Sequence, residues 1–170
     1  MFGPESFLLL EGPALPSNSY EYALNLLSAR AYTARNLRRK LVQKEFHPAE
    51  VDSALERLVA SRLIDDIRFA HEYARQKLIA GGSRRRVEQE LLKRGIARDT
   101  VVEAVGRVID EEAIDTSAGL AKAAAKKLAS LGELDQHVRR RRAFAFLARR
   151  GFDLTDIKIV LDRLLADDDQ

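Results

Sequence analysis

The chain has 170 residues, of which 46% are hydrophobic and 32% are charged, a balance typical of a soluble globular domain or a short array of domains. It has no cysteine, which excludes disulfides and thiolate metal sites and fits a reducing cytosol, so we expect a cytoplasmic protein. Its net charge of +3 is modest, and its 6% of aromatic residues favours stacked helices over a β-sandwich.

Residues 1–18 are interrupted by three prolines and two glycines, which leaves no room for a helix of three turns. We expect this segment to be a flexible N-terminal arm. The apolar run at residues 7–10 is too short for a signal peptide, and no run in the chain is long enough to span a membrane.

Residues 19–64 are interpreted as a first three-helix repeat. Apolar spacing predicts helices at residues 19–31, 34–44 and 48–61. Thr33 is suited to cap the second helix, because its hydroxyl can accept a hydrogen bond from a free amide of the first turn. Pro48 can open the third helix, because proline is tolerated in a first turn.

Residues 65–114 form a second repeat, with helices predicted at residues 66–80, 84–94 and 98–112. Asp65 and Ser83 have the residue types that cap helix N-termini. The adjacent carboxylates of Asp65 and Asp66 suggest a metal or an acid–base pair only weakly, because helix starts attract Asp and no third ligand is visible. Gly95 is expected to end the middle helix in a left-handed conformation.

Residues 115–166 form a third repeat, followed by an acidic tail at residues 167–170. Its helices are predicted at residues 116–131, 136–150 and 154–166, the middle one opened by Asp135 or Gln136. Gly151 takes the role of Gly95. Glu45 stands at the same place in the first repeat, so we predict a different turn geometry there.

Six apolar positions recur with the same spacing in the three segments. They are Leu37, Leu41, Phe46, Val51, Leu55 and Leu58, then Val87, Leu91, Ile96, Val101, Val105 and Val108, then Ala143, Leu147, Phe152, Ile157, Leu161 and Leu164. The second set follows the first by 50 residues and the third follows the second by 56. The predicted fold is therefore all-α, an elongated, solenoid-like array of three tandem helix-turn-helix-like repeats of three helices each.

No pattern in the chain predicts catalysis or a cofactor. The histidines at 47, 71 and 137 stand alone, without a metal-binding spacing or a nucleophile nearby. The loop Gly81-Gly82-Ser83 precedes a helix but lacks the lysine and spacing of a nucleotide-binding P-loop. We therefore expect a protein that is not an enzyme and that has no metal or cofactor.

Each repeat has a basic first half and an acidic second half. At roughly 100° per residue on a helical wheel, Arg35, Arg85 and Arg141 share one slot of the middle helix. Including the neighbouring slots, the candidate contact residues are Arg35, Arg39, Arg85, Arg86, Lys93, Arg141, Arg142 and Arg149. One such face is usually a solvated surface, whereas three in equivalent slots favour a long polyanionic partner, and both interpretations remain open.

Sequence-specific recognition of a DNA major groove is disfavoured. A helix-turn-helix protein reads bases with polar or basic residues at the start of its last helix. The corresponding starts here, at residues 47–50, 97–100 and 153–156, carry acidic side chains. A repressor is therefore a poor fit to this chain.

The chain resembles the RecX family of recombination regulators over residues 19–165. The resemblance is carried by the repeats, by Arg30-Ala31-Tyr32-Thr33, by the stretch LIDDIRFA at residues 63–70, and by Gly95-Ile96 and Gly151-Phe152 at the repeat ends. It implies an all-helical array that binds RecA filaments and restrains their ATPase, strand-exchange and co-protease activities, without a cofactor of its own.

The first hypothesis is thus a monomer that lies along a RecA filament on single- or double-stranded DNA, with its basic faces towards DNA phosphate and acidic groups of RecA. In this role it would act in recombination, DNA repair and the SOS response. Two alternatives remain: a sequence-independent DNA-binding protein that acts without RecA, and a helical scaffold for another protein.

Overall fold

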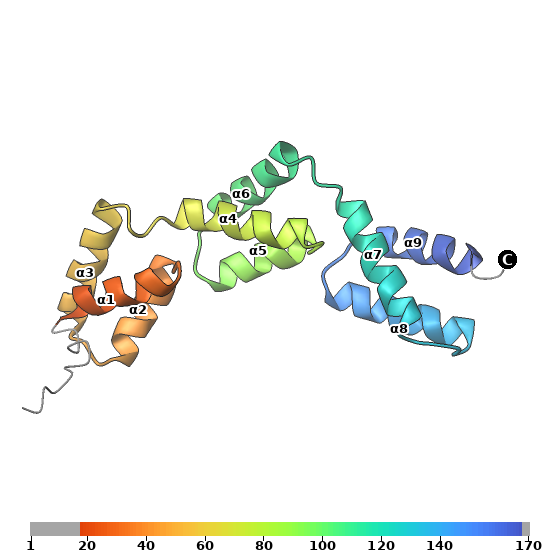
Figure 1. The fold of residues 1–170 in the computed structure, drawn as a ribbon, viewed down its shortest axis with the longest axis horizontal. Coiled ribbons are helices and arrows are strands. Elements are labelled where there is room, and N and C mark those ends of the chain that lie inside the picture. The colour runs from red at the N-terminus through yellow and green to blue at the C-terminus, as the bar shows by residue number, and fades with distance from the viewer. Residues whose placement is uncertain (1–17, 168–170) are drawn as a thin grey trace, which may run out of the picture.

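The structure is a computed structural model that describes residues 18–167; the arm predicted at residues 1–18, apart from Asn18, and the end of the predicted tail lie outside it. Within this range the chain forms nine α-helices and no strand. They are α1 (Ser19–Ala29), α2 (Ala34–Gln43), α3 (Pro48–Ala60), α4 (Asp66–Ile79), α5 (Arg84–Lys93), α6 (Arg98–Glu111), α7 (Thr116–Ala129), α8 (Gln136–Arg149) and α9 (Leu154–Asp167). The predicted all-α array of three three-helix repeats is confirmed, and it is elongated (Figure 1).

Side-chain caps begin most of these helices. Thr33, Asp65 and Ser83 each accept a hydrogen bond from the backbone N–H three residues ahead, as their residue types predict. Asp135 begins α8 in the same manner, by accepting from the amides of His137 and Val138. Two of these caps, Thr33 and Ser83, stand at the starts of the middle helices α2 and α5, where neighbouring repeats meet.

The turn after α2 differs from the expectation. Glu45 has a φ of 65°, in the same left-handed region as Gly95 at 86° and Gly151 at 82°. The prediction of a different geometry at Glu45 was therefore wrong: the turn is the same in all three repeats. A residue with a side chain is accepted in the first repeat at the modest cost of a left-handed non-glycine residue.

Each repeat has its own hydrophobic core. Helices pack against the other helices of their own triplet, and the buried side chains form three separate clusters. Sixteen of the eighteen repeated apolar positions are buried, and the two exceptions, Phe46 and Leu164, are half-buried against their clusters. The array is thus three small cores in a row, without a continuous core running through it.

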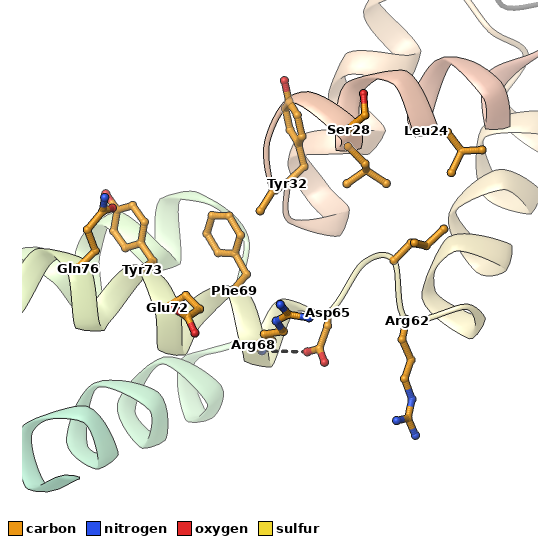
Figure 2. A pocket seen from close by; sticks show the side chains of 13 residues that line it. Leu24, Ser28, Tyr32, Arg62, Asp65, Arg68, Phe69, Glu72, Tyr73 and Gln76 are labelled. Atoms are coloured by element: carbon orange, nitrogen blue, oxygen red, sulfur yellow. Dashed lines mark hydrogen bonds between the residues drawn. The ribbon is translucent and has the colours of Figure 1, made fainter. Parts of the chain in front are cut away.

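Adjacent repeats meet at two joints. At joint 1–2, between the first two repeats, α1 and α4 face each other across a pocket (Figure 2). At joint 2–3 the N-terminal ends of α5, α7 and α9 converge around a second pocket. The joints matter for function because they set how the three repeats line up.

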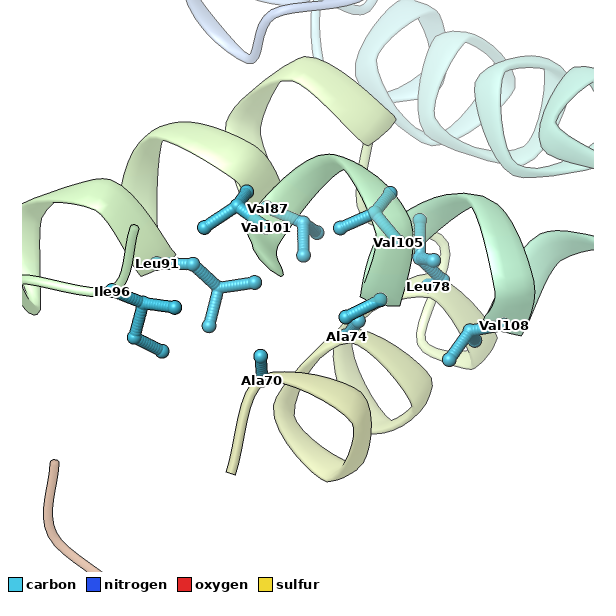
Figure 3. Packing of buried hydrophobic residues seen from close by; sticks show 10 residues of the cluster. Ala70, Ala74, Leu78, Val87, Leu91, Ile96, Val101, Val105 and Val108 are labelled. Atoms are coloured by element: carbon cyan, nitrogen blue, oxygen red, sulfur yellow. The ribbon is translucent and has the colours of Figure 1, made fainter. Parts of the chain in front are cut away.

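The core of the second repeat shows how the helices of a triplet are fastened. Leu91 and Val105 are fully buried between α5 and α6 (Figure 3). Ala70 and Ala74 are also fully buried, and their small side chains let α4 pack against α6, the most extensive helix pair of the molecule. The burial of each large side chain in this core contributes about 1.5–3 kcal/mol to the free energy of unfolding, because its apolar surface is removed from water.

Candidate interaction surface along the middle helices

The two joints are built from the same hydrogen bond. Thr33, the N-cap of α2, donates its hydroxyl to the carbonyl oxygen of Arg94, the C-cap residue of α5, at 2.8 Å. Ser83, the N-cap of α5, donates in the same way to the carbonyl oxygen of Arg150, the C-cap residue of α8, at 2.7 Å. An exposed backbone acceptor at the end of one middle helix is thereby satisfied by the cap of another.

Glycine allows this close approach. A Cβ atom on Gly95 would lie 2.1 Å from Cδ of Arg35, and one on Gly151 would lie 3.0 Å from Oγ of Ser83. Glu45 occupies the equivalent position in the first repeat, which forms no such joint at this turn within the described residues. The glycines therefore serve the joints as well as the left-handed turns.

The middle helices α2, α5 and α8 consequently follow one another, with the N-terminus of each meeting the C-terminus of the next. They lie along the lower side of the array in Figure 1. The positive end of each helix dipole meets the negative end of its neighbour, which is the favourable order. We call these three helices the middle-helix line.

All eight candidate contact residues are exposed on this line. Two of them have partners within the protein: Arg86 pairs with Glu90 on its own helix at 3.0 Å, and the stem of Arg35 lies against Gly95. Within the described residues the other six form no ion pair; they are Arg39, Arg85, Lys93, Arg141, Arg142 and Arg149. They are free to meet an anionic partner.

The shared wheel slot does not give its members the same surroundings. Arg35 and Arg85 stand in the first turn of α2 and α5, at the joints, and Arg85 lines the pocket at joint 2–3. Arg141 lies further along its helix, because α8 begins one turn earlier than α2 and α5 do in their repeats. The structure brings the candidates onto one line but does not gather them into a single cluster.

An aromatic pocket that the sequence did not predict lies at joint 1–2. Its volume is about 860 Å³, and Tyr32 from the α1–α2 turn together with Phe69 and Tyr73 from α4 contribute its rings (Figure 2). The rings of Phe69 and Tyr73 are nearly parallel, with centroids 6.0 Å apart. Their spacing of four residues on one helix face was the signal that could have indicated it.

Cations lie over these rings. The guanidinium of Arg30 is 4.7 Å from the centroid of Tyr32, and that of Arg94 is 4.3 Å from the centroid of Tyr73. The Tyr73 hydroxyl donates to Glu90 at 2.6 Å, and this hydrogen bond lowers the pKa of Glu90, while burial is the main cause that raises the pKa of Tyr73. We call Tyr32, Phe69, Tyr73 and the side chains around them the aromatic pocket.

The pocket at joint 2–3 has a different character. Its volume is about 930 Å³, and its exposed apolar residues, Leu154 and Ile159, are aliphatic. Its one aromatic residue, Phe152, is buried in the core of the third repeat. Asp153 at its edge accepts backbone hydrogen bonds from Thr155 and Asp156, which lower the pKa of this carboxyl.

The described residues contain no group of three or more side chains able to hold a metal ion. His47 caps α3 and His71 faces Glu111 at 3.2 Å, while Asp65 caps α4. Asp66 crosses joint 1–2 and accepts a hydrogen bond from the backbone N–H of Ala34 at 3.0 Å.

Among the helices of residues 18–167, none has the length and apolarity needed to cross a membrane.

Comparison with known proteins matches all three repeats to one family. The models for the first, second and third three-helix domains of RecX match residues 20–58, 65–105 and 117–161. Regulatory protein RecX of Chromobacterium violaceum is 36% identical over 152 residues, covering 89% of this chain and 91% of the relative. That of Chlorobium phaeobacteroides is 32% identical over 148 residues, covering 86% and 93%.

Solved structures show the same fold. A crystal structure of regulatory protein RecX superimposes with a TM-score of 0.73 at 21% identity, covering 85% of this chain and 70% of the other. RecX from Lactobacillus salivarius superimposes with a TM-score of 0.69 at 20% identity, covering 86% and 94%.

Proposed function

Because this chain belongs to the RecX family of regulatory proteins, we propose that it binds RecA–DNA filaments and restrains the ATPase, strand-exchange and co-protease activities of RecA. It would act as a non-enzymatic regulator of recombination, DNA repair and the SOS response in the cytoplasm. The observation that carries this proposal is the middle-helix line, which repeats exposed cations along the length of the array.

The shape of the array supports a filamentous partner. A filament offers the same anionic groups at regular intervals, and an elongated ligand with repeated cations can engage several of them in succession. Seven of the eight candidate side chains, all but Arg86, have no ion-pair partner within the described residues, so binding a polyanion breaks no internal pair of theirs.

The direct test is the ATPase activity of RecA on single-stranded DNA with this protein titrated in. We expect the rate to fall in a saturable manner at a ratio well below one protein per RecA subunit, since one elongated chain contacts several subunits. An unchanged ATPase rate, with the protein shown to be folded, would contradict the proposal.

A second candidate is sequence-independent DNA binding without RecA, favoured by the same exposed cations. The salt dependence of binding distinguishes these two candidate functions. Pure phosphate binding to single strands weakens with a slope of about −0.7 in log K against log[salt] for each neutralised phosphate. If the protein contacts both RecA and DNA, it should stay bound to the RecA–DNA filament at salt concentrations at which it dissociates from naked DNA.

A further inference from the structure

We propose that the aromatic pocket at joint 1–2 takes an unstacked base of single-stranded DNA. This inference rests on the proposed function in one respect: it assumes that DNA runs along the middle-helix line. Proteins that bind single strands pair a positive track with aromatic faces on which bases stack, because every base has a π-face.

The rings form an open platform between two repeats. Phe69 and Tyr73 lie nearly parallel on α4, at an interplanar angle of 9°, and Tyr32 lines the same pocket from the first repeat (Figure 2). All three are half-buried, so part of each ring remains in contact with solvent. The volume of about 860 Å³ lies within the range of small-ligand sites, roughly 300–1,000 Å³.

The other joint shows that these rings are not needed to join two repeats. At joint 2–3, fifty residues further along the chain, the positions of Tyr32, Phe69 and Tyr73 are taken by Gly82, Gly119 and Ala123. There the backbones touch: a Cβ atom on Gly119 would lie 3.3 Å from Cα of Gly81. At these positions joint 2–3 brings backbone against backbone, whereas joint 1–2 carries aromatic side chains that joining two repeats does not require, which points to a ligand at joint 1–2.

The charges around the pocket suit a nucleotide. Arg94 and Lys77 lie over the ring of Tyr73, and Arg30 lies over that of Tyr32, so cations flank the ring platform where the neighbouring phosphates of a strand would pass. The lining also includes Gln76 and Glu72, whose side chains can hydrogen-bond the edge of a base.

The pocket is continuous with the middle-helix line. Tyr32 directly precedes Thr33, whose hydroxyl is bonded to Arg94, and the guanidinium of Arg94 lies over Tyr73. A strand that follows the cations of α2 and α5 must pass this joint. One of its bases can turn into the pocket there without the backbone leaving the line.

The experiment measures binding of the full chain to naked oligonucleotides, without RecA. The probes are a fluorescein-labelled oligothymidylate of about 16 nucleotides and the same oligonucleotide with abasic residues at its centre. The test variant is Phe69→Leu combined with Tyr73→Leu, which keeps apolar bulk but removes the π-faces. Tyr73→Phe keeps the ring and removes only the hydrogen bond to Glu90.

Phe146→Leu is the matched control. Phe146 lies on α8 with Arg150 and Lys127 over its ring, at 4.9 and 5.4 Å, but it lines neither pocket. We expect the wild-type protein, Tyr73→Phe and Phe146→Leu to prefer the intact strand about fivefold or more, which corresponds to the weaker end of measured base stacking. The double variant should lose this preference and keep its affinity for the abasic strand.

The base site is overturned if the wild-type protein binds both strands equally, or if the folded double variant keeps the preference. Loss of RecA-filament binding in the double variant, with no preference in any protein, would assign the pocket to a protein contact and would also overturn it. RecA ATPase titrations with the wild-type protein decide the proposed function separately, so the two failures are distinguishable.

Discussion

The hydroxyl of Ser83 and the carbonyl oxygen of Arg150 are 2.7 Å apart, which ties the start of one middle helix to the end of the next. The same hydroxyl accepts a hydrogen bond from the backbone N–H of Arg86 at 3.3 Å. One small side chain therefore caps α5 and fastens the third repeat, and Thr33 does both for α2 and the second repeat.

Substitutions at Ser83 should separate these two roles. Ser83→Ala removes both hydrogen bonds and should lower the free energy of unfolding by about 1–2 kcal/mol. Ser83→Asp can still cap the helix but cannot donate to Arg150, so it should retain helicity while loosening joint 2–3. Small-angle scattering should show a changed radius of gyration for both variants and none for Ser83→Thr. A wild-type profile for Ser83→Asp would mean that the bond does not set the joint.

Leu91 tests the core of the second repeat. It is fully buried, so Leu91→Ala should lower the free energy of unfolding by roughly 2–5 kcal/mol. Because the cores are separate, hydrogen exchange should speed up in α4, α5 and α6 and far less in the other repeats. The neighbouring Leu92, which is 38% exposed, is the control, and Leu92→Ala should leave the melting temperature within a few degrees. Equal effects of the two would contradict the repeat register.

Charge reversal tests the middle-helix line. Arg85→Glu combined with Arg141→Glu should weaken filament binding by at least about tenfold, or ~1.4 kcal/mol, because both side chains are exposed and unpaired within the described residues. Lys158→Glu with Arg163→Glu makes the same charge change on α9, where both side chains are also exposed. Anisotropy of a labelled RecA–DNA filament measures both pairs. Equal losses would show that the middle helices provide no special surface.

A chain that ends at Ile114 tests the number of repeats. The first two repeats keep complete cores in this truncation, so circular dichroism should show a folded helical protein. It should leave the filament faster and suppress the RecA ATPase less at equal concentration, because one set of contacts is lost. Undiminished inhibition would place the activity in the first two repeats.

The raised pKa of Asp66 predicts an unusual pH dependence of the free energy of unfolding. Burial is the main cause that raises the pKa of this carboxyl above its usual 3.8, and the hydrogen bond from Ala34 opposes it. A raised pKa in the folded state means that the stabilising contribution is complete below 3.8 and is lost as the pH rises through the folded-state pKa. Asp66→Asn keeps an acceptor without the charge.

This variant should therefore be as stable as the wild type or slightly more stable at neutral pH, by less than about 1 kcal/mol, because the half-buried group still meets solvent. The difference should shrink as the solution is acidified towards the ordinary pKa of Asp. Asp65→Asn, at an exposed cap where Asn serves equally well, is the matched control for removing a carboxylate at this turn. A less stable Asp66→Asn at neutral pH would contradict the argument.

Local chemistry explains what could be predicted from the sequence. The buried positions follow the helical period, and caps such as Thr33 and Ser83 are set by residues within one turn. The wrong prediction at Glu45 has a cause outside the turn. A left-handed turn accepts a residue with a side chain, and what requires glycine at Gly95 is the approach of Arg35 from the first repeat.

The joints and the aromatic pocket could not be predicted in this way. Thr33 and Arg94 are 61 residues apart, and a single hydroxyl–carbonyl bond has no periodic signal in the sequence. The candidate cations lie exposed on the middle helices. The pair of Arg86 and Glu90 is four residues apart on one helix and could have been predicted from the sequence, whereas the packing of Arg35 against Gly95 depends on another repeat, which the helical wheel does not include.

The joint chemistry also bears on self-association. A second copy could extend the array only by bringing its Glu45 turn to the start of α8, as Gly95 and Gly151 are brought to α2 and α5. Asp135 begins α8 with a carboxylate that cannot donate the hydrogen bond made by Thr33 and Ser83, and Glu45 would add a second negative charge beside it. We therefore expect head-to-tail polymers to be disfavoured at both ends of such a contact, although the protein is built from repeating units.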